Sequence, residues 1–385
     1  MKDRTRLIAE GRHARSAGGA INPPVVHAST VLFPTLKTLR QAVKDRHDTF
    51  FYGRFGTPTS KAFGQAIATL EGAEGCALFP SGTAAMACAI LSLAHEGCHV
   101  LLPDNGYEAT VNFAHTLDDL GIASSHYDPL CGAAIGNEIR DNTALAVLES
   151  PGSLTFEVGD IPAMVAACRA GGVRTVMDNT WATPLFFKPL AHGVDISVEA
   201  ATKYIVGHSD AMMGCASASG SVWKKLRRTA LRLGYCAAPD DCYLALRGLR
   251  TLDVRLQRHQ QNGLALARWL GDQPAVGRVL HPALPGCPGY TIFVRDFAGA
   301  PGLFSFVTRE FNELALAAMV DGLTHFGMGF SWGGFESLLL PASPSRKLQP
   351  FTGPGHLIRV HAGLEDIDDL TTDLEAGLQR FEDHL

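Results

Sequence analysis

The sequence lacks the segments that mark membrane and nucleic-acid-binding proteins. It has no run of roughly 18 or more apolar residues, so we expect no membrane-spanning helix. It has no long uninterrupted Lys/Arg run of the kind that neutralises phosphates, and its formal net charge is −5, which argues against nucleic acid as a partner. The residues from Met1 to Arg6 carry charge but lack the apolar segment of a signal peptide. We therefore expect small-molecule chemistry in the cytoplasm.

The sequence also lacks the patterns of metal, disulfide and nucleotide sites. Its nine cysteines are scattered and contain no Cys-x-x-Cys pair, which is typical of a reducing compartment. The histidines, His208 included, have no metal-ligand spacing, so we predict no metal site. Neither Gly-x-x-x-x-Gly-Lys-Ser/Thr nor Gly-x-Gly-x-x-Gly occurs, which argues against a nicotinamide oxidoreductase.

A chain of 385 residues is longer than one hydrophobic core usually spans, so two packed domains are expected. We predict an N-terminal arm over residues 1–50, in which the segment Ile21–Val26 is broken by two prolines. A large domain over 51–245 and a C-terminal small domain over 246–385 follow.

Within the large domain, short apolar runs alternate with helical patterns. The predicted strands are residues 75–79, 99–103, 144–149 and 175–178, and residues 161–170 form a predicted helix closed by two glycines. This alternation predicts an α/β domain with a mostly parallel sheet and helices on both faces.

The C-terminal part of the sequence shows a different pattern of predicted elements. Residues 240–270 form one long predicted helical region that bridges the two domains. Strands at 302–307 and 357–361, with helices at 313–326 and 366–385, then predict a smaller α+β domain.

Lys203 is the first candidate for chemistry. It follows a strand-like run and precedes a turn containing Gly207, among apolar neighbours. Desolvation favours the neutral amine, which is the nucleophile in Schiff-base chemistry. A surface lysine at a strand end is the alternative.

Asp178 ends a predicted buried strand about 25 residues before Lys203, enough for one crossover between neighbouring parallel strands. Ligands of α/β folds bind at this carboxyl edge of the sheet. A pyridoxal 5′-phosphate (PLP) site needs a carboxylate here to keep the pyridine nitrogen protonated. A helix N-cap is the alternative for Asp178 alone.

The segment Pro80–Met86 follows another predicted strand with small residues that open a helix. Free backbone N–H groups and the positive end of the helix dipole favour an anion there. This segment is a candidate phosphate cradle, with an ordinary capped helix as the alternative.

Together these segments resemble the Cys/Met-metabolism family of PLP-dependent enzymes over almost the whole chain, and within it the bacterial branch of β-lyases. The motifs that carry the resemblance are residues 51–54 (FYGR), 105–108 (NGYE), 149–153 (ESPGS), 178–181 (DNTW), 201–210 (ATKYIVGHSD), 331–337 (SWGGFES) and 357–366 (LIRVHAGLED).

The resemblance implies PLP as cofactor and the aspartate-aminotransferase-like fold (fold type I) for the large domain. It implies that Lys203 carries the cofactor and that Asp178 pairs with its pyridine nitrogen. It also implies that Tyr107 stacks over the ring with its hydroxyl near the substrate. The implied phosphate ligands are Gly82, Thr83 and Thr202, joined by Tyr52 and Arg54 from a neighbouring subunit. The implied substrate-binding residues are Arg359 for the α-carboxylate, with Ser331 and Trp332.

Several of these residues also have a purely structural interpretation. Tyr52 and Tyr107 can be core aromatics with a solvated hydroxyl, Arg54 and Arg359 ion-pair partners, and Trp332 a packing residue. Ala200 departs from many relatives outside the β-lyase branch, which have a serine there that touches the phosphate.

The resemblance further implies α,β-elimination of L-cystathionine to homocysteine, pyruvate and ammonia. It implies at least a homodimer, and a tetramer built as a dimer of dimers. A γ-acting relative, whether a methionine γ-lyase, a cystathionine γ-lyase or a γ-synthase, is the alternative within the family. A non-catalytic regulator that keeps the fold is the alternative from another class. Either Lys203 or Tyr107 can remove the α-proton.

Overall fold

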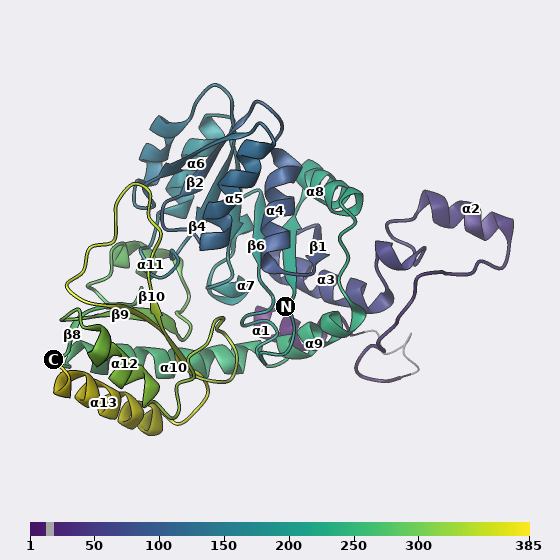
Figure 1. The fold of residues 1–385 in the computed structure, drawn as a ribbon. Coiled ribbons are helices and arrows are strands. Elements are labelled where there is room, and N and C mark those ends of the chain that lie inside the picture. The colour runs from purple at the N-terminus through teal and green to yellow at the C-terminus, as the bar shows by residue number, and fades with distance from the viewer. Residues whose placement is uncertain (13–18) are drawn as a thin grey trace.

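The computed structural model describes residues 1–12 and 19–385, and within them two sheets organise the chain (Figure 1). The first sheet has the order β1-β7-β6-β5-β4-β2-β3. Its strands are β1 (Gly75–Phe79), β2 (His99–Pro103), β3 (Ala123–Tyr127), β4 (Thr143–Glu149), β5 (Arg174–Asp178), β6 (Ile196–Glu199) and β7 (Gly214–Ala218). Strands β3, β2, β4, β5 and β6 are mutually parallel, and β7 runs antiparallel to β6 and β1. The predicted strands and the mostly parallel sheet are therefore confirmed.

Apolar side chains on both faces of the central strand β4 explain why helices cover both sides of this sheet. Leu145 and Val147 pack into a core with helix α4, whereas Ala146 and Leu148 pack into a second core with α6. The helices around the sheet are α3 (Pro58–Glu71), α4 (Gly82–Leu93), α5 (Glu108–Asp119), α6 (Ile161–Ala170), α7 (Thr183–Phe186) and α8 (Gly220–Arg232), with 3-10 turns η2 (Gly132–Glu138) and η3 (Pro189–His192). Helix α6 has the predicted bounds, because the Asp160 carboxylate caps its first turn.

The second sheet is antiparallel, in the order β10-β11-β9-β8. Its elements are β8 (Val276–Leu280), α11 (Tyr290–Asp296), β9 (Leu303–Thr308), α12 (Glu313–Asp321), β10 (Leu338–Ala342), β11 (Leu357–His361) and α13 (Ile367–Asp383). The predicted helix 313–326 is too long, since α12 ends at Asp321. The Asp373 carboxylate accepts backbone N–H groups of Thr324, His325 and Phe326, which holds them outside a helix.

The single helical region predicted over 240–270 is wrong, because the chain forms two helices, α9 (Pro239–Leu249) and α10 (Leu252–Gly271). The break is stabilised at the carbonyl of Gly248. That oxygen accepts from the Thr251 amide at 3.1 Å and from the Arg255 guanidinium at 2.8 Å. The side chain of Arg255 therefore replaces the backbone donor that would continue helix α9. Figure 1 shows α10 running from α9 along the second sheet, where it contacts β8 and β9.

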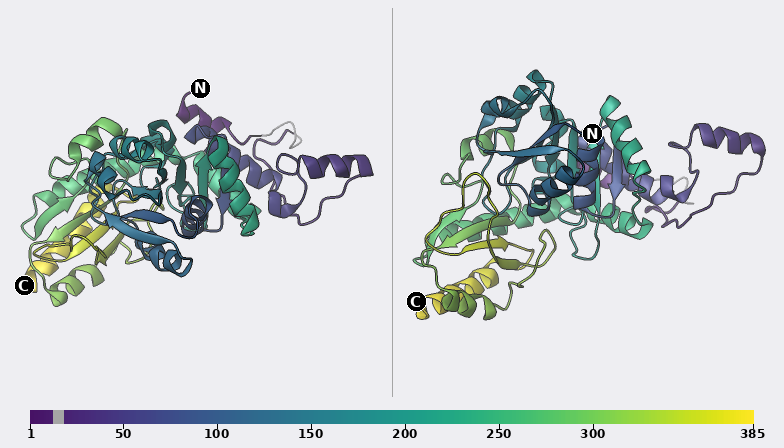
Figure 2. Two further views of the ribbon diagram at one scale, coloured as in Figure 1. Left: turned by 90° about the horizontal axis from the view of Figure 1, so that it is seen from above. Right: turned by 45° about the horizontal axis from the view of Figure 1, so that its top comes forward.

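The first fifty residues contain α1 (Asp3–Ala9), which packs on the body, and α2 (Leu36–Lys44), which stands apart from it (Figures 1 and 2). The segment Ile21–Val26 forms neither helix nor strand, as its prolines predict. The 3-10 turn η1 (Gly53–Phe55) leads back to the body. Leu32, Leu36 and Val43 are exposed, so this part of the chain presents apolar surface to solvent. No helix in the described residues is long and apolar enough to cross a membrane.

Candidate active site

Lys203 lies in the turn that follows β6, directed toward the second sheet. Its Nζ donates to Ser331 Oγ at 2.7 Å and lies 5.3 Å from the centre of the Trp332 ring. Burial and then the positive charge of Arg359 lower the pKa of Lys203 to about 8, while the charge of Asp178 acts in the opposite direction. The amine is therefore neutral in a large fraction of molecules at mildly alkaline pH, as a nucleophile requires.

The turn that carries Lys203 is held from behind by a buried arginine. Arg255 on α10 donates to the carbonyl oxygens of Tyr204 at 2.7 Å and Ile205 at 3.3 Å. Burial lowers the pKa of Arg255 to about 10, and the carbonyl oxygens around it satisfy its donors. The lysine thus projects from a backbone that is fixed by hydrogen bonds.

Asp178 ends β5, which is paired in parallel with β6, so it and the lysine turn lie at the same edge of the sheet. The amide of Thr180 donates to Asp178 Oδ1 at 2.9 Å. Burial raises the pKa of Asp178, and the hydrogen bonds from Thr180 and the charge of Lys203 limit the rise. A half-buried carboxylate at this position suits a cationic partner such as a protonated pyridine nitrogen.

Tyr107 precedes α5 and is half exposed, with its backbone N–H bonded to Glu149 Oε2 at 2.7 Å. Burial and the charges of Asp178, Glu108 and Glu149 raise its pKa, and the charge of Arg359 opposes them. Its hydroxyl therefore stays protonated at neutral pH. Sequence reasoning assigned Glu149 no role; its position beside Asp178 in the β4–β5 register is visible only in the fold.

The candidate phosphate cradle forms at the N-terminus of α4. Ser81 caps the helix by accepting the Ala84 N–H at 3.1 Å, and the amides of Gly82 and Thr83 start the helix. A Cβ placed on Gly82 would lie 2.5 Å from the Cβ of Ala200, so only glycine allows this approach to the lysine-bearing segment. The Thr202 hydroxyl accepts from the Met213 amide at 2.9 Å.

Arg359 lies on β11 of the second sheet. Its guanidinium donates to the Ser331 carbonyl at 3.0 Å, and burial lowers its pKa. Ser331 therefore contacts both cationic groups, the lysine through its hydroxyl and the arginine through its carbonyl. The structure brings Lys203, Arg359, Ser331 and Trp332 together as the sequence predicts.

Tyr52 and Arg54 are placed elsewhere. Arg54 donates to the carbonyl of Leu231 on α8 at 2.8 Å, and its guanidinium lies 5.0 Å from the Phe55 ring. Both residues line a cavity of about 1020 Å³ between the arm and the body. In the part of the chain described, no hydrogen bond, ion pair or ring contact joins either of them to Lys203. That they bind the phosphate in a neighbouring subunit stays a prediction.

The fold, with a lysine, an aspartate, an arginine and a candidate phosphate cradle around one site, is the arrangement expected of enzymes that bind a phosphorylated aldehyde cofactor. Over residues 4–379 the chain matches the family described as Cys/Met metabolism PLP-dependent enzyme. The chain belongs to this family. Its fold class, with a type I large domain and a smaller α+β domain, and PLP as cofactor are therefore confirmed.

Individual relatives match over almost their full length. The cystathionine β-lyase MetC of Escherichia coli (strain K12) is 44% identical, covering 98% of each chain. The L-alanine/L-glutamate racemase of Wolbachia pipientis wMel is 41% identical, covering 99% of this chain and 98% of its own. A crystal structure of cystathionine γ-synthase from Xanthomonas oryzae pv. oryzae, in complex with aminoacrylate and cysteine, superposes with a TM-score of 0.92 at 31% identity over 100% of both chains.

Proposed function

We propose that the protein cleaves L-cystathionine by α,β-elimination to homocysteine, pyruvate and ammonia. The observation that carries the proposal is the convergence of Lys203 and Arg359 on Ser331, which sets a carboxylate-binding guanidinium beside a reactive amine. Similarity favours the β-lyase reaction, because identity to a β-lyase is 44% and identity to the γ-synthase is 31%.

The residues around Lys203 fit PLP. In our proposal Lys203 would hold the cofactor, Asp178 would pair with its pyridine nitrogen, and Gly82, Thr83 and Thr202 would bind the phosphate. Bound PLP supplies an electron sink for the charge that develops at the substrate α-carbon. The neutral fraction of Lys203 and the close approach at Gly82 both support this assignment.

The substrate is oriented and deprotonated by the opposite side of the site. Arg359 would bind the α-carboxylate as a planar bidentate donor, Ser331 and Trp332 would line the same end, and Tyr107 would contact the cofactor from its own side of the site. We propose Lys203 as the base that removes the α-proton, because its pKa of about 8 lies near physiological pH, whereas that of Tyr107 is raised. The β-carbon–sulfur bond then breaks, and the thiolate takes a proton, for which the Tyr107 hydroxyl, kept protonated by its raised pKa, is the proposed donor. The unsaturated amine that remains is hydrolysed to pyruvate and ammonia.

We further propose that the enzyme is at least a homodimer, and a tetramer built as a dimer of dimers. Tyr52 and Arg54 would then complete the phosphate site of a neighbouring subunit. The exposed apolar residues of the arm support this, since such surface usually packs against another chain. We propose the division into arm (1–50), large domain (51–245) and small domain (246–385), and a cytoplasmic location, which suits nine cysteines without a disulfide in the described chain.

Amino-acid racemisation is a second candidate function, favoured by the 41% identity to a racemase. Racemisation needs removal and return of the α-proton without loss of a β-substituent. The same Lys203 and Tyr107 would serve it. A substrate without a leaving group, such as L-alanine, separates the two reactions.

The deciding experiment offers L-cystathionine to the PLP-reconstituted protein and identifies the oxo acid released. Pyruvate supports the β-lyase proposal, and 2-oxobutanoate would move the function to the γ-acting branch. Formation of D-alanine from L-alanine, without pyruvate from cystathionine, would favour the racemase. Lack of every product would favour a non-catalytic regulator. The Lys203→Ala protein is the control that must lose every activity seen.

A further inference from the structure

The loop between β10 and β11 crosses from the second sheet to the first. We define its residues 343–349 as the strap, visible in Figure 1 as part of the long loop that rises toward β2 and α6. Arg346 in the strap extends its side chain to the loops that follow β2 and β4 of the first sheet. Its side chain is only 8% exposed, although the residues around it in the strap are mostly solvent-accessible.

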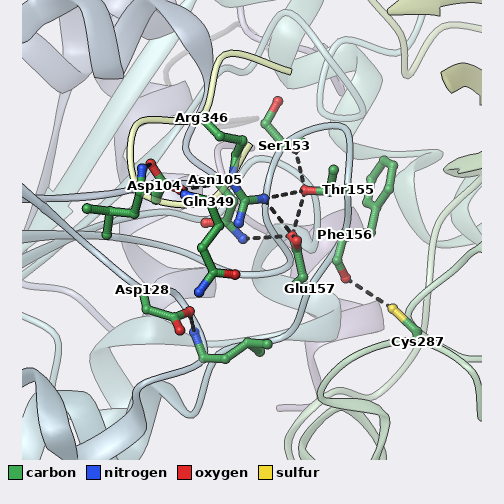
Figure 3. A network of polar contacts seen from close by, with 12 residues as sticks. Asp104, Asn105, Asp128, Ser153, Thr155, Phe156, Glu157, Cys287, Arg346 and Gln349 are labelled. Atoms are coloured by element: carbon green, nitrogen blue, oxygen red, sulfur yellow. Dashed lines mark hydrogen bonds and ion pairs between the residues drawn. The ribbon is translucent and has the colours of Figure 1, made fainter. Parts of the chain in front are cut away.

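Figure 3 shows Arg346 between two carboxylates. Its Nε lies 3.0 Å from Asp104 Oδ2, and its Nη1 lies 2.9 Å from Glu157 Oε1 and 3.1 Å from Thr155 Oγ1. The Asp104 side chain is 1% exposed and that of Glu157 is 15% exposed. Ion pairs buried to this degree are lost at considerable cost when one partner is removed, unlike pairs on the surface.

Asp104 also holds the strap by its backbone. Its carboxylate accepts the amides of Lys347 at 2.6 Å, Leu348 at 3.0 Å and Gln349 at 3.3 Å. Burial acts to raise the pKa of Asp104, but the strap amides and Arg346 outweigh it and leave the pKa below its ordinary value. The carboxylate is therefore ionised while the strap is docked.

The segment clamped in this way leads directly to the tyrosine of the site. Asp104 follows β2, and three residues later comes Tyr107, whose amide is bonded to Glu149. Asn105 between them donates through Nδ2 to Glu157 Oε2 at 3.2 Å. The strap thus holds the start of the short loop that carries Tyr107, through Asp104 directly and through Asn105 by way of Glu157, while Glu149 on β4 holds its Tyr107 end.

At its other end the strap follows β10, the strand that pairs with β11, which carries Arg359. Leu340 on β10 pairs with Arg359 on β11, three residues before the strap begins. One covalent segment therefore connects the neighbour of Arg359 with the support of Tyr107. Tyr107 follows a strand of the first sheet and Arg359 lies in the second sheet, so neither sheet alone sets the distance between them.

We propose that Arg346 is a positioning residue that holds Tyr107 in register with Arg359 by docking the strap on Asp104 and Glu157. This role rests on the proposed elimination, because Tyr107 and Arg359 act there on one substrate. A loosened strap lets the Tyr107 loop shift, and displacement of a catalytic group by about 1 Å can cost up to 100-fold in rate.

The strap itself is tested without substrate. Trypsin is added to the PLP-loaded wild type, Arg346→Gln and Arg346→Lys proteins, and cleavage after exposed Lys347 is followed by mass spectrometry. Docking protects the Lys347–Leu348 bond, since both amides are bonded to Asp104. We expect cleavage to be about tenfold faster in Arg346→Gln, and cleavage at the wild-type rate would overturn the proposal.

Positioning is tested by kinetics with L-cystathionine. We expect kcat to fall about tenfold in Arg346→Gln with unchanged PLP content, and Arg346→Lys to recover part of the loss. Combined with Tyr107→Phe, the two effects on kcat should not add, because Arg346 acts through Tyr107. A normal kcat with an open strap, or additive effects, would overturn the proposal. Failure of both Arg346 variants to fold would do the same, since Arg346 would then be a requirement for folding.

Arg295 provides the matched control. It also bridges two carboxylates, Asp160 and Asp296, but its side chain is 51% exposed and touches neither the strap nor the Tyr107 loop. Arg295→Gln should leave strap cleavage and kcat unchanged. A wild-type protein that releases no pyruvate would refute the proposed function, while the trypsin result would still decide whether the strap docks through Arg346.

Discussion

Lys203 Nζ and Ser331 Oγ lie 2.7 Å apart although 128 residues separate them in the chain. The lysine comes from the turn that follows β6 and the serine from the loop between α12 and β10. Ser331 has a φ of 83°, a left-handed conformation that costs a non-glycine residue about 1 kcal/mol or more. The site therefore retains a strained serine where its hydroxyl meets the lysine.

This strain predicts that Ser331→Gly and Ser331→Ala differ in stability but not in activity. Both lose the hydroxyl, so we expect kcat to fall about tenfold in each, because the lysine loses its orienting partner. Glycine relieves the left-handed strain, so Ser331→Gly should unfold at about 1 kcal/mol higher free energy than Ser331→Ala. Urea unfolding and steady-state kinetics of both variants test this. Equal stabilities would show that the conformation carries no strain.

The charge of Arg359 predicts a change in the reactivity of Lys203. It is among the causes that lower the pKa of Lys203 to about 8, so Arg359→Met should move that pKa upward. At a given pH below the wild-type value, less of the amine is then neutral, and acylation of Lys203 in PLP-free protein becomes slower. Mass spectrometry of acylation rates across pH measures this, with exposed Lys224 as internal reference. An unchanged or lowered midpoint would contradict it.

Glu199 predicts a pH-dependent stability difference. It is buried, its Oε2 has no hydrogen-bond partner in the described chain, and burial and then the charge of Glu71 raise its pKa well above 4.5. A raised pKa stabilises the fold fully below the unfolded-state value, and this contribution is lost as pH rises. Glu199→Gln has no such loss.

Thermal unfolding from pH 5 to pH 8 measures this difference. We expect the Tm of Glu199→Gln to exceed that of wild type increasingly as pH rises. At the upper end of the range the free energy of unfolding should be greater by about 1–3 kcal/mol. Parallel Tm curves for the two proteins would show that Glu199 does not titrate on unfolding.

The packing of Gly82 predicts a loss of cofactor affinity. In Gly82→Ala the new methyl group meets the Cβ of Ala200, so the start of α4 must move away from the lysine segment. We expect PLP to bind at least about tenfold more weakly, since helix amides misplaced relative to the phosphate lose their hydrogen bonds. Gly271→Ala, where no atom lies within 4 Å, is the control and should bind PLP normally. Fluorescence titration with PLP measures both constants, and equal affinities would refute the cradle.

Much of the large domain follows from local sequence, because buried parallel strands are continuous apolar runs and their helices end in caps. The 25-residue spacing also placed Asp178 and Lys203 at one sheet edge, as the β5–β6 pairing confirms. The ends of α9 and α12 did not follow, since Arg255 and Asp373 terminate them through contacts from other elements. Local patterns carry no signal for such contacts.

Arg346 illustrates what sequence reasoning misses in the site. It lies in a loop rich in proline and serine, and its carboxylate partners are 242 and 189 residues away. An isolated arginine there reads as a solvated charge. For Tyr52 and Arg54 the opposite holds. The family resemblance predicts that they bind the phosphate in a neighbouring subunit, whereas in the single chain they line a cavity away from Lys203.

Helix α10 sets the distance between the two halves of the active site. Near its start, Arg255 fixes the lysine turn through the Tyr204 carbonyl, and one turn later His259 Nδ1 lies 2.8 Å from the carbonyl oxygen of Ala362, just beyond β11. One inserted residue between these two side chains would rotate them by about 100° and displace them by about 1.5 Å. A working enzyme therefore requires that the number of residues between Arg255 and His259 stay fixed, since an insertion or deletion here would break one of the two contacts.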